Sequence, residues 1–144
     1  KHTRYTAGSL LRSEALARRF AGGYLWVFRL SVDDYHRYIY VDSGRESVRR
    51  RIPGVLHTVN PAANDVYSIY KENTREYSLM KSEHFGTLLM EKGNFAFGAS
   101  TIIYMTQKGC VVPDQDLLTN SQEGVETKVQ IGSKIGSAPF LEKG

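Results

Sequence analysis

Residues 24–41 read YLWVFRLSVDDYHRYIYV and carry the clearest fold signal in the chain. Apolar or aromatic side chains recur at every second position over 24–32, and residues 35–41 are again rich in strand-forming types. A period of two is typical of β-strands, because successive side chains point to opposite faces of the sheet. The stretch therefore predicts extended structure, with a dense polar cluster at 33–37.

The rest of the chain places short elements around this stretch. Residues 9–20 read SLLRSEALARRF and predict one amphipathic helix, with Ser9 as its N-cap and Gly22-Gly23 as its stop. Further extended segments are expected at 76–79, 85–90, 95–106 with a break at Gly98-Ala99, and 125–135. The turn signals lie at 42–44, 52–54 and 108–109.

These elements predict an α+β fold that is mostly β. We expect antiparallel sheets of sandwich or barrel type, with a lipoyl-like (barrel-sandwich hybrid) character and a minor helical part. The 144 residues fit one domain over 1–144. No run approaches the ~18 apolar residues of a membrane-spanning helix. Since the chain opens at Lys1 without a methionine, we expect it to belong to a longer protein.

Charge and cysteine content narrow the classes of partner and site. The net charge is +4, and the basic residues gather at 18–19 and 49–51. These clusters fit either solvated turns or an anionic partner such as a phospholipid headgroup. Nucleic acid is not expected, because aromatic residues do not interleave with the basic ones. The single Cys110 excludes an internal disulfide and a cysteine-based zinc site, and it favours a reducing compartment.

Three histidines lie in contexts that chemistry could use. His36 follows Asp34 by two residues, so on a strand both side chains would share one face. His57 lies in a loop context, and His84 precedes Phe85-Gly86. Taken singly, each is more often a surface or loop histidine than a catalytic one. Sequence spacing shows no set of three metal ligands, so no metal is expected.

A second signal is the run Gly98-Ala99-Ser100-Thr101, where small residues interrupt an apolar stretch directly before two hydroxyl side chains. A β-bulge or tight bend explains the pattern structurally. A nucleophile on a strained turn explains it functionally. The residues alone leave both interpretations open.

Four segments in order resemble the phosphatidylserine decarboxylase family. Residues 28–37, FRLSVDDYHR, resemble its FRLSPxDYHR segment, and residues 52–61, IPGVLHTVNP, resemble its IPGxLxxVNP segment. Asn73-Thr74-Arg75 is similar to its N-x-R element, and residues 97–101, FGAST, are similar to its self-processing motif. The matched span runs from about Ala21 to Gly136. Four matches in family order make the resemblance specific.

Two departures from the family pattern are visible. Ala99 stands where the family has glycine, directly before the serine. Glycine relaxes the backbone limits on attack at the preceding carbonyl, so we expect slower processing in this chain. The family pattern also has a further strand and loop, some tens of residues long, and the resemblance predicts that these are missing between Met90 and Glu91.

The resemblance implies a proenzyme that cuts itself between Ala99 and Ser100, into a large portion 1–99 and a small portion 100–144. Ser100 would become a covalent pyruvoyl group, the cofactor that accepts electrons as carbon dioxide leaves the substrate. The family uses an Asp-His-Ser triad, onto which Asp34 and Ser100 map. His84 is the preferred histidine and His36 the fallback, and His84, His36 and His57 are candidate proton donors.

The implied reaction converts phosphatidylserine to phosphatidylethanolamine, by an enzyme bound peripherally on the cytoplasmic side of a membrane. Its partners would be the lipid, the membrane surface and its own cleaved subunit, with a homo-oligomer left open. One alternative is a soluble relative that decarboxylates a free amino acid such as tryptophan. Another is a non-catalytic binding module of lipoyl-like architecture. The 10–20 helix with Arg18-Arg19 favours a lipid surface if its apolar face is free, and a core helix if it is not.

Overall fold

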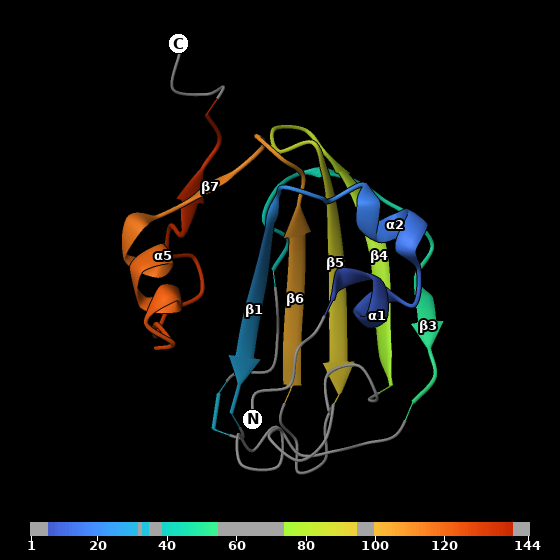
Figure 1. Cartoon of the computed structure of the whole chain (residues 1–144), viewed down its shortest axis with the longest axis horizontal. Helices are drawn as coiled ribbons and strands as arrows, with labels where there is room; N and C mark the ends of the chain where they lie inside the picture. Colours follow the sequence, from blue (N-terminus) through green and yellow to red (C-terminus); the bar gives the residue numbers. More distant parts are fainter. Residues whose placement is uncertain (1–5, 32, 35–38, 55–73, 95–99, 140–144) are drawn as a thin grey trace.

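The computed structural model describes residues 6–31, 33–34, 39–54, 74–94 and 100–139, with the backbone alone for 92–94 and 100 (Figure 1). The N-terminal half of the described chain contains α1 (Ala7–Leu11), α2 (Glu14–Arg18), β1 (Tyr24–Leu30), β2 (Gly44–Glu46) and β3 (Arg50–Ile52). The second half contains β4 (Arg75–Ser82), β5 (Thr87–Asn94), β6 (Ser100–Thr106), β7 (Val112–Pro113), α5 (Gln115–Gln122) and β8 (Gly136–Ser137).

A six-stranded antiparallel sheet forms the body of the molecule. Its order is β1-β6-β5-β4-β2, and β3 pairs with β4 as well. At one end of the sheet Ser100 pairs with Leu30 and Asn94, and at the other Thr106 pairs with Tyr24 and Leu88. We call these the Ser100 end and the Thr106 end. The seven residues of β6 separate them by roughly 20 Å.

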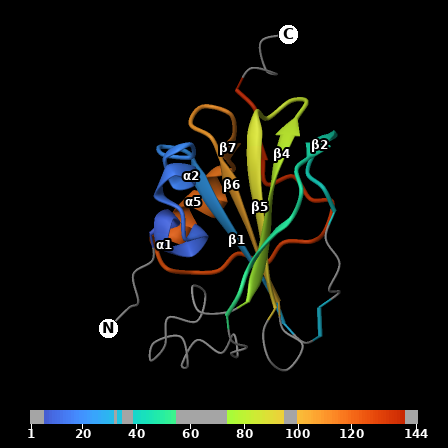
Figure 2. The same ribbon diagram turned by 90° about the vertical axis from the view of Figure 1, so that its right-hand side faces the viewer.

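Both short helices cover one face of this sheet (Figure 2). Leu10 and Leu11 of α1, with Phe20 just after α2, pack with Leu89, Ile103 and Met105 of the sheet, and Leu16 and Ala17 of α2 lie partly buried against this cluster. The opposite face buries a second cluster built from Met90, Ile102 and Tyr104, against which Trp26, Phe28 and Leu30 pack. Burial of apolar surface on both faces supplies the main favourable term for this fold.

The predicted 9–20 helix is two helices in the structure. Thr6, not Ser9, is the N-cap of α1, since its hydroxyl accepts the Ser9 N–H at 3.0 Å and the Ser9 side chain returns the bond. Arg12, with φ of +50°, ends α1, and Ser13 caps α2 through the Leu16 N–H at 3.2 Å. Leu10 and Leu11 of α1 lie in the core and Leu16 and Ala17 of α2 pack against it, so the segment fits the alternative of a core helix better than that of a free apolar membrane face.

The fold class is confirmed: the described residues are mostly antiparallel strands with short helices. The strand expected from Tyr24 is β1, and 76–79 lies within β4. Residues 39–41 form no strand, and 35–38 lie outside the described residues. The alternating stretch 125–135 also forms no strand, and α5 was not predicted from the sequence. The lipoyl-like character is not confirmed.

Candidate functional site

Ser100 is the first residue of β6 and therefore begins one of the inner strands of the sheet. Its backbone pairs with Leu30 of β1 on one side and with Asn94 of β5 on the other. Strands on both sides fix the position of residue 100 more firmly than a loop would. Ala99 lies outside the described residues, so the structure gives no backbone geometry for the bond before Ser100.

Asp34 lies at the same end of the sheet as Ser100. It follows β1 by four residues, and Leu30 at the end of β1 is the pairing partner of Ser100. The Asp34 carboxylate accepts hydrogen bonds from the Ser31 amide at 2.7 Å and the Ser31 hydroxyl at 2.9 Å. The turn after β1 thus holds a carboxylate near the Ser100 end. His36 and His57 lie outside the described residues.

His84 lies at the opposite end, in the turn between β4 and β5. Lys81 and Thr87 pair beside this turn, and Leu88 pairs with Thr106. The separation of roughly 20 Å along the sheet means that the structure does not bring His84 to Ser100. The sequence-based prediction of His84 as the base for Ser100 finds no geometric support here.

The partner of His84 is Asp42, a residue that the sequence reasoning missed. The imidazole Nδ1 lies 2.9 Å from the Asp42 carboxylate, which also accepts the His84 amide at 2.8 Å and the Ser82 hydroxyl. The side chain of Asp42 is 10% exposed and that of His84 is 48% exposed. In the sequence, Asp42 is recognisable only as part of the turn signal at 42–44, because its partner His84 lies 42 positions away.

The electrostatics of this pair follow from its hydrogen bonds. Burial opposes ionisation of Asp42, but the bonds from Ser82 and His84 together hold its pKa well below the ordinary range. The hydrogen bond to Asp42, followed by its negative charge, raises the pKa of His84. This ion pair joins residue 42 to the β4–β5 turn.

A second ionic pair lies buried under α1 at the Ser100 end. Arg75, the arginine of the N-x-R element, is 1% exposed and donates through Nε and Nη2 to the Leu10 carbonyl at 2.9 and 2.5 Å. Its Nε also lies 3.6 Å from Glu91 Oε1. Burial raises the pKa of Glu91 to about 8, while the charge of Arg75 opposes the rise.

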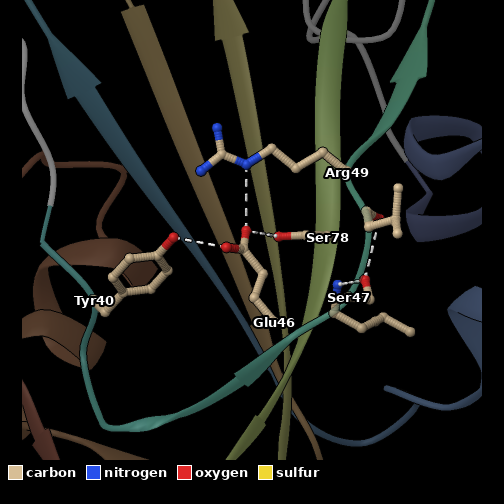
Figure 3. Close-up of polar contacts among 7 residues, drawn as sticks. Tyr40, Glu46, Ser47, Arg49 and Ser78 are labelled. Carbon is tan, nitrogen blue, oxygen red and sulfur yellow. Dashed lines mark hydrogen bonds and ion pairs between the residues drawn. The ribbon is translucent and has the colours of Figure 1, made fainter.

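Part of the basic cluster at 49–51 is explained by structure. Arg50 and Arg51 lie in β3, so this cluster is not a turn. Figure 3 shows Arg49 beside Glu46, whose carboxylate also accepts the hydroxyls of Tyr40 and Ser78, each at 2.7 Å. These bonds from Ser78 and Tyr40 lower the pKa of Glu46. The bonds that converge on Glu46 anchor β2 and its flanks to the sheet.

An open pocket of about 410 Å³ lies between α2, the connection from β2 to β3, and the strands β3 and β4. Its lining residues are Ser13, Leu16, Ser47, Val48, Arg50, Tyr77 and Leu79. None of these is a predicted catalytic residue. No helix in the described part of the chain is long and apolar enough to cross a membrane.

Comparison with known proteins gives a consistent set of matches. A family model described as phosphatidylserine decarboxylase matches residues 1–92. The phosphatidylserine decarboxylase proenzyme 2 of Clostridium acetobutylicum is 39% identical over 159 residues, which covers 94% of this chain and 55% of that protein. The proenzyme of Ruminiclostridium cellulolyticum is 35% identical, covering 92% of this chain and 53% of its own. No solved structure matches.

The lengths of these alignments carry further information. The chain spans about half the length of the curated relatives it matches. The matched stretches run over 159 residues, more than the 144 of this chain, so the relatives hold residues within the span that have no counterpart here. That these fall between Met90 and Glu91 stays a prediction.

Proposed function

Because the chain belongs to the phosphatidylserine decarboxylase family, we propose that it is the self-processing core of a pyruvoyl-dependent phosphatidylserine decarboxylase. The observation that supports this best is the position of Ser100 at the start of β6, paired on both sides, with the Asp34 turn at the same end of the sheet. The serine of the processing motif thus has a fixed backbone and a carboxylate nearby.

The proposed processing uses the chain's own atoms. The Ser100 hydroxyl attacks the Ala99 carbonyl, and the peptide bond becomes an ester on Oγ. Loss of the residue-100 α-proton then breaks the Cβ–Oγ bond, and residues 1–99 leave as a carboxylate that keeps the serine oxygen. Hydrolysis of the resulting dehydroalanine gives the pyruvoyl group. That group, once formed, supplies an electron sink for decarboxylation.

A serine hydroxyl needs a base to attack at neutral pH. Asp34 is proposed to orient that base, in the sense in which a triad carboxylate orients its histidine. Since His84 lies at the Thr106 end, we assign the base to His36, two residues from Asp34, and keep His57 as a candidate proton donor in decarboxylation. His84 is left with a structural role through Asp42.

The proposed substrate is phosphatidylserine, at a membrane surface on the cytoplasmic side, as the names of the relatives suggest for the lipid. The α1–α2 pair does not contribute an apolar membrane face to this proposal, because Leu10, Leu11 and Phe20 are buried. Exposed Arg18 and Arg19 remain available to anionic lipid.

The decisive experiment is intact mass analysis of the purified chain beside Ser100→Ala. We expect two fragments that divide between residues 99 and 100, with a ketone on the smaller one that a hydrazide traps. The Ser100→Ala chain should stay whole. A wild-type chain that remains uncut after long incubation contradicts the proposal. His36→Ala and His84→Ala should differ, with cleavage lost only in the former.

The residue before the serine provides a graded test. Ala99→Gly should process faster than the natural sequence, because glycine reaches strained backbone conformations that alanine avoids. The rate of fragment appearance on a denaturing gel measures this. Equal rates would show that the backbone of residue 99 does not limit attack.

A further inference from the structure

Two deeply buried polar atoms have no hydrogen-bond partner among the described residues: Glu91 Oε2 and Thr101 Oγ1. Each residue is only 2% exposed. An unpaired buried polar group costs about 1–3 kcal/mol, so folded proteins rarely leave two close together. Where protein partners are lacking, a buried water commonly supplies the missing bonds.

The sheet register places both side chains around one gap. Gly93 of β5 pairs with Arg75 of β4 on one side and with Thr101 of β6 on the other. Paired residues share a face of the sheet, and Gly93 has no side chain to fill the space between its neighbours. Glu91 lies two residues earlier on that face, and its Oε1 is within 3.6 Å of Arg75.

The spacing suits a single small molecule. Glu91 pairs with Ile103, so Thr101 is its diagonal neighbour across β5 and β6. Diagonal neighbours lie about 7–8 Å apart, with the side chains somewhat closer. One water that makes two hydrogen bonds of about 2.8 Å joins oxygens up to about 5.6 Å apart, a reach that suits the side chains extending inward from this backbone separation. Arg75, Glu91 and Thr101 are each at most 2% exposed, and Arg75 is bonded to the Leu10 carbonyl of α1, so solvent does not reach these side chains.

We propose that Glu91 and Thr101 hold one water molecule above Gly93, and that this water is the one consumed when residue 100 releases its nitrogen during self-processing. The inference rests on the proposed function for its second half. Thr101 is the residue directly after the reacting one, and the structure places no other orphaned buried side-chain atom in the described part of the chain.

The step balances without any other reactant. After elimination, dehydroalanine 100 tautomerises to an imine whose carbon is the residue-100 Cα. The water oxygen bonds to that carbon, the carbon–nitrogen bond breaks, and the nitrogen leaves as ammonia with both water hydrogens. No oxidation or reduction occurs. The product is the ketone of the pyruvoyl group, adjacent to the Thr101 amide.

The protonation of Glu91 suits this role. Because burial raises its pKa to about 8, the carboxyl keeps its proton at neutral pH and can donate as well as accept. The Thr101 hydroxyl can do the same. The two groups can therefore orient the water oxygen toward residue 100 while its hydrogens shift to nitrogen.

The chemical test compares Thr101→Val, which removes the hydroxyl at constant shape, with Thr101→Ser, which keeps it. Chain cleavage on a denaturing gel should proceed in both. Formation of the ketone and release of ammonia should be at least about tenfold slower in Thr101→Val and near the natural rate in Thr101→Ser. Ketone formation that keeps pace with cleavage in Thr101→Val overturns the assigned role.

A direct test does not depend on processing. A high-resolution crystal structure of the uncut Ser100→Ala chain should show a water within hydrogen-bond distance of both Glu91 Oε2 and Thr101 Oγ1. An empty space there, or a direct bond between the two side chains, overturns the water site. A wild-type chain that never cuts contradicts the proposed function instead, and the Ser100→Ala structure then decides the water site by itself.

Discussion

One pair of facing acidic and basic side chains from each end of the central sheet can be compared, and the pair with the shorter separation is the more exposed one. At the Thr106 end, His84 and Asp42 are 2.9 Å apart, and His84 is about half exposed. At the Ser100 end, Arg75 and Glu91 are 3.6 Å apart, and both are almost wholly buried. The closer pair is solvated, and the more distant pair is enclosed.

Burial, rather than separation, decides what each pair does for the fold. Water screens the exposed pair and can replace either partner, so its contribution is modest. In the enclosed pair the guanidinium of Arg75 is the buried charge, and the Glu91 carboxyl beside it keeps its proton at neutral pH. Removal of either side chain leaves a buried polar partner that water cannot reach, so breaking the enclosed pair is costly. Arg75 also satisfies the Leu10 carbonyl near the end of α1, and thereby joins the helices to the sheet. The enclosed pair therefore contributes more to the stability of the fold than the exposed pair does.

The largest expected effect comes from Arg75→Met. It leaves the Leu10 carbonyl buried without its donor and the Glu91 carboxyl buried without its polar neighbour, and should lower the free energy of unfolding by about 1–3 kcal/mol for each of these two groups. Urea unfolding followed by tryptophan fluorescence measures it. The double variant Arg75→Met with Glu91→Leu should recover a large part of the loss. No recovery would show that packing of the arginine stem, and not charge, dominates.

A smaller loss is expected at the other end from Asp42→Asn. This change removes a charged acceptor of the Ser82 hydroxyl and of two His84 groups, and should cost about 1–2 kcal/mol of unfolding free energy. His84→Ala, measured the same way, should cost less because it removes only the bond between the imidazole and Asp42. A loss in Asp42→Asn as large as that in Arg75→Met would contradict the distinction between the two ends.

Dependence on pH separates the same two pairs. The pKa of Glu91 is raised from 4.5 to about 8 on folding, so its contribution to stability is complete below pH 4.5 and is lost as pH rises to 8. The raised pKa of His84 acts in the same direction above pH 6.5, and the lowered pKa of Asp42 costs stability only below pH 3.8. We expect a higher urea midpoint at pH 5 than at pH 8.

Two variants test which residue causes the difference in urea midpoint between pH 5 and pH 8. Glu91→Gln should remove most of the difference between pH 5 and pH 8, and His84→Gln should remove little, because His84 is solvated. The opposite ranking of the two variants would mean that the His84–Asp42 pair, and not the buried Glu91 carboxyl, governs how the urea midpoint depends on pH.

The smallest effect should come from a third pair, Arg29 and Glu126. Two hydrogen bonds of 2.8 and 2.6 Å join them, shorter than either pair above, but the Glu126 side chain is 71% exposed. Glu126→Gln should change the free energy of unfolding by less than about 1 kcal/mol. A larger change in thermal or urea unfolding would show that residues 125–135 are held mainly by this contact.

The alternation of apolar and polar residues predicted one strand correctly and another wrongly. The alternation of 24–32 gave β1, because an antiparallel strand with one covered face must alternate. The same reasoning placed a strand at 125–135, where Val125, Val129 and Ile131 are exposed and no partner strand is present among the described residues. An alternating pattern indicates which face of a strand could be buried, but it does not show whether another strand or helix is present to cover that face.

The candidate site was predictable in its residue types and not in its pairings. Ser100 and Asp34 could be selected from short motifs, and the register places both at one end. The family resemblance favours His84 as the base for Ser100, but the order of motifs along a chain does not give their distance in space. The two ends of the sheet, where these residues lie, are separated by roughly 20 Å along β6. Asp42 and Glu91 escaped notice because their meaning comes from partners 42 and 16 positions away, His84 and Arg75.

The position of β6 has a consequence for what a cut before Ser100 would leave behind. The piece that begins at residue 100 contributes a strand hydrogen-bonded along its full length to β1 and to β5, both of which belong to the other piece. The two products would be interlocked like a split protein whose halves complement each other. They should co-purify under native conditions, and separating them should require the same denaturant that unfolds the intact chain.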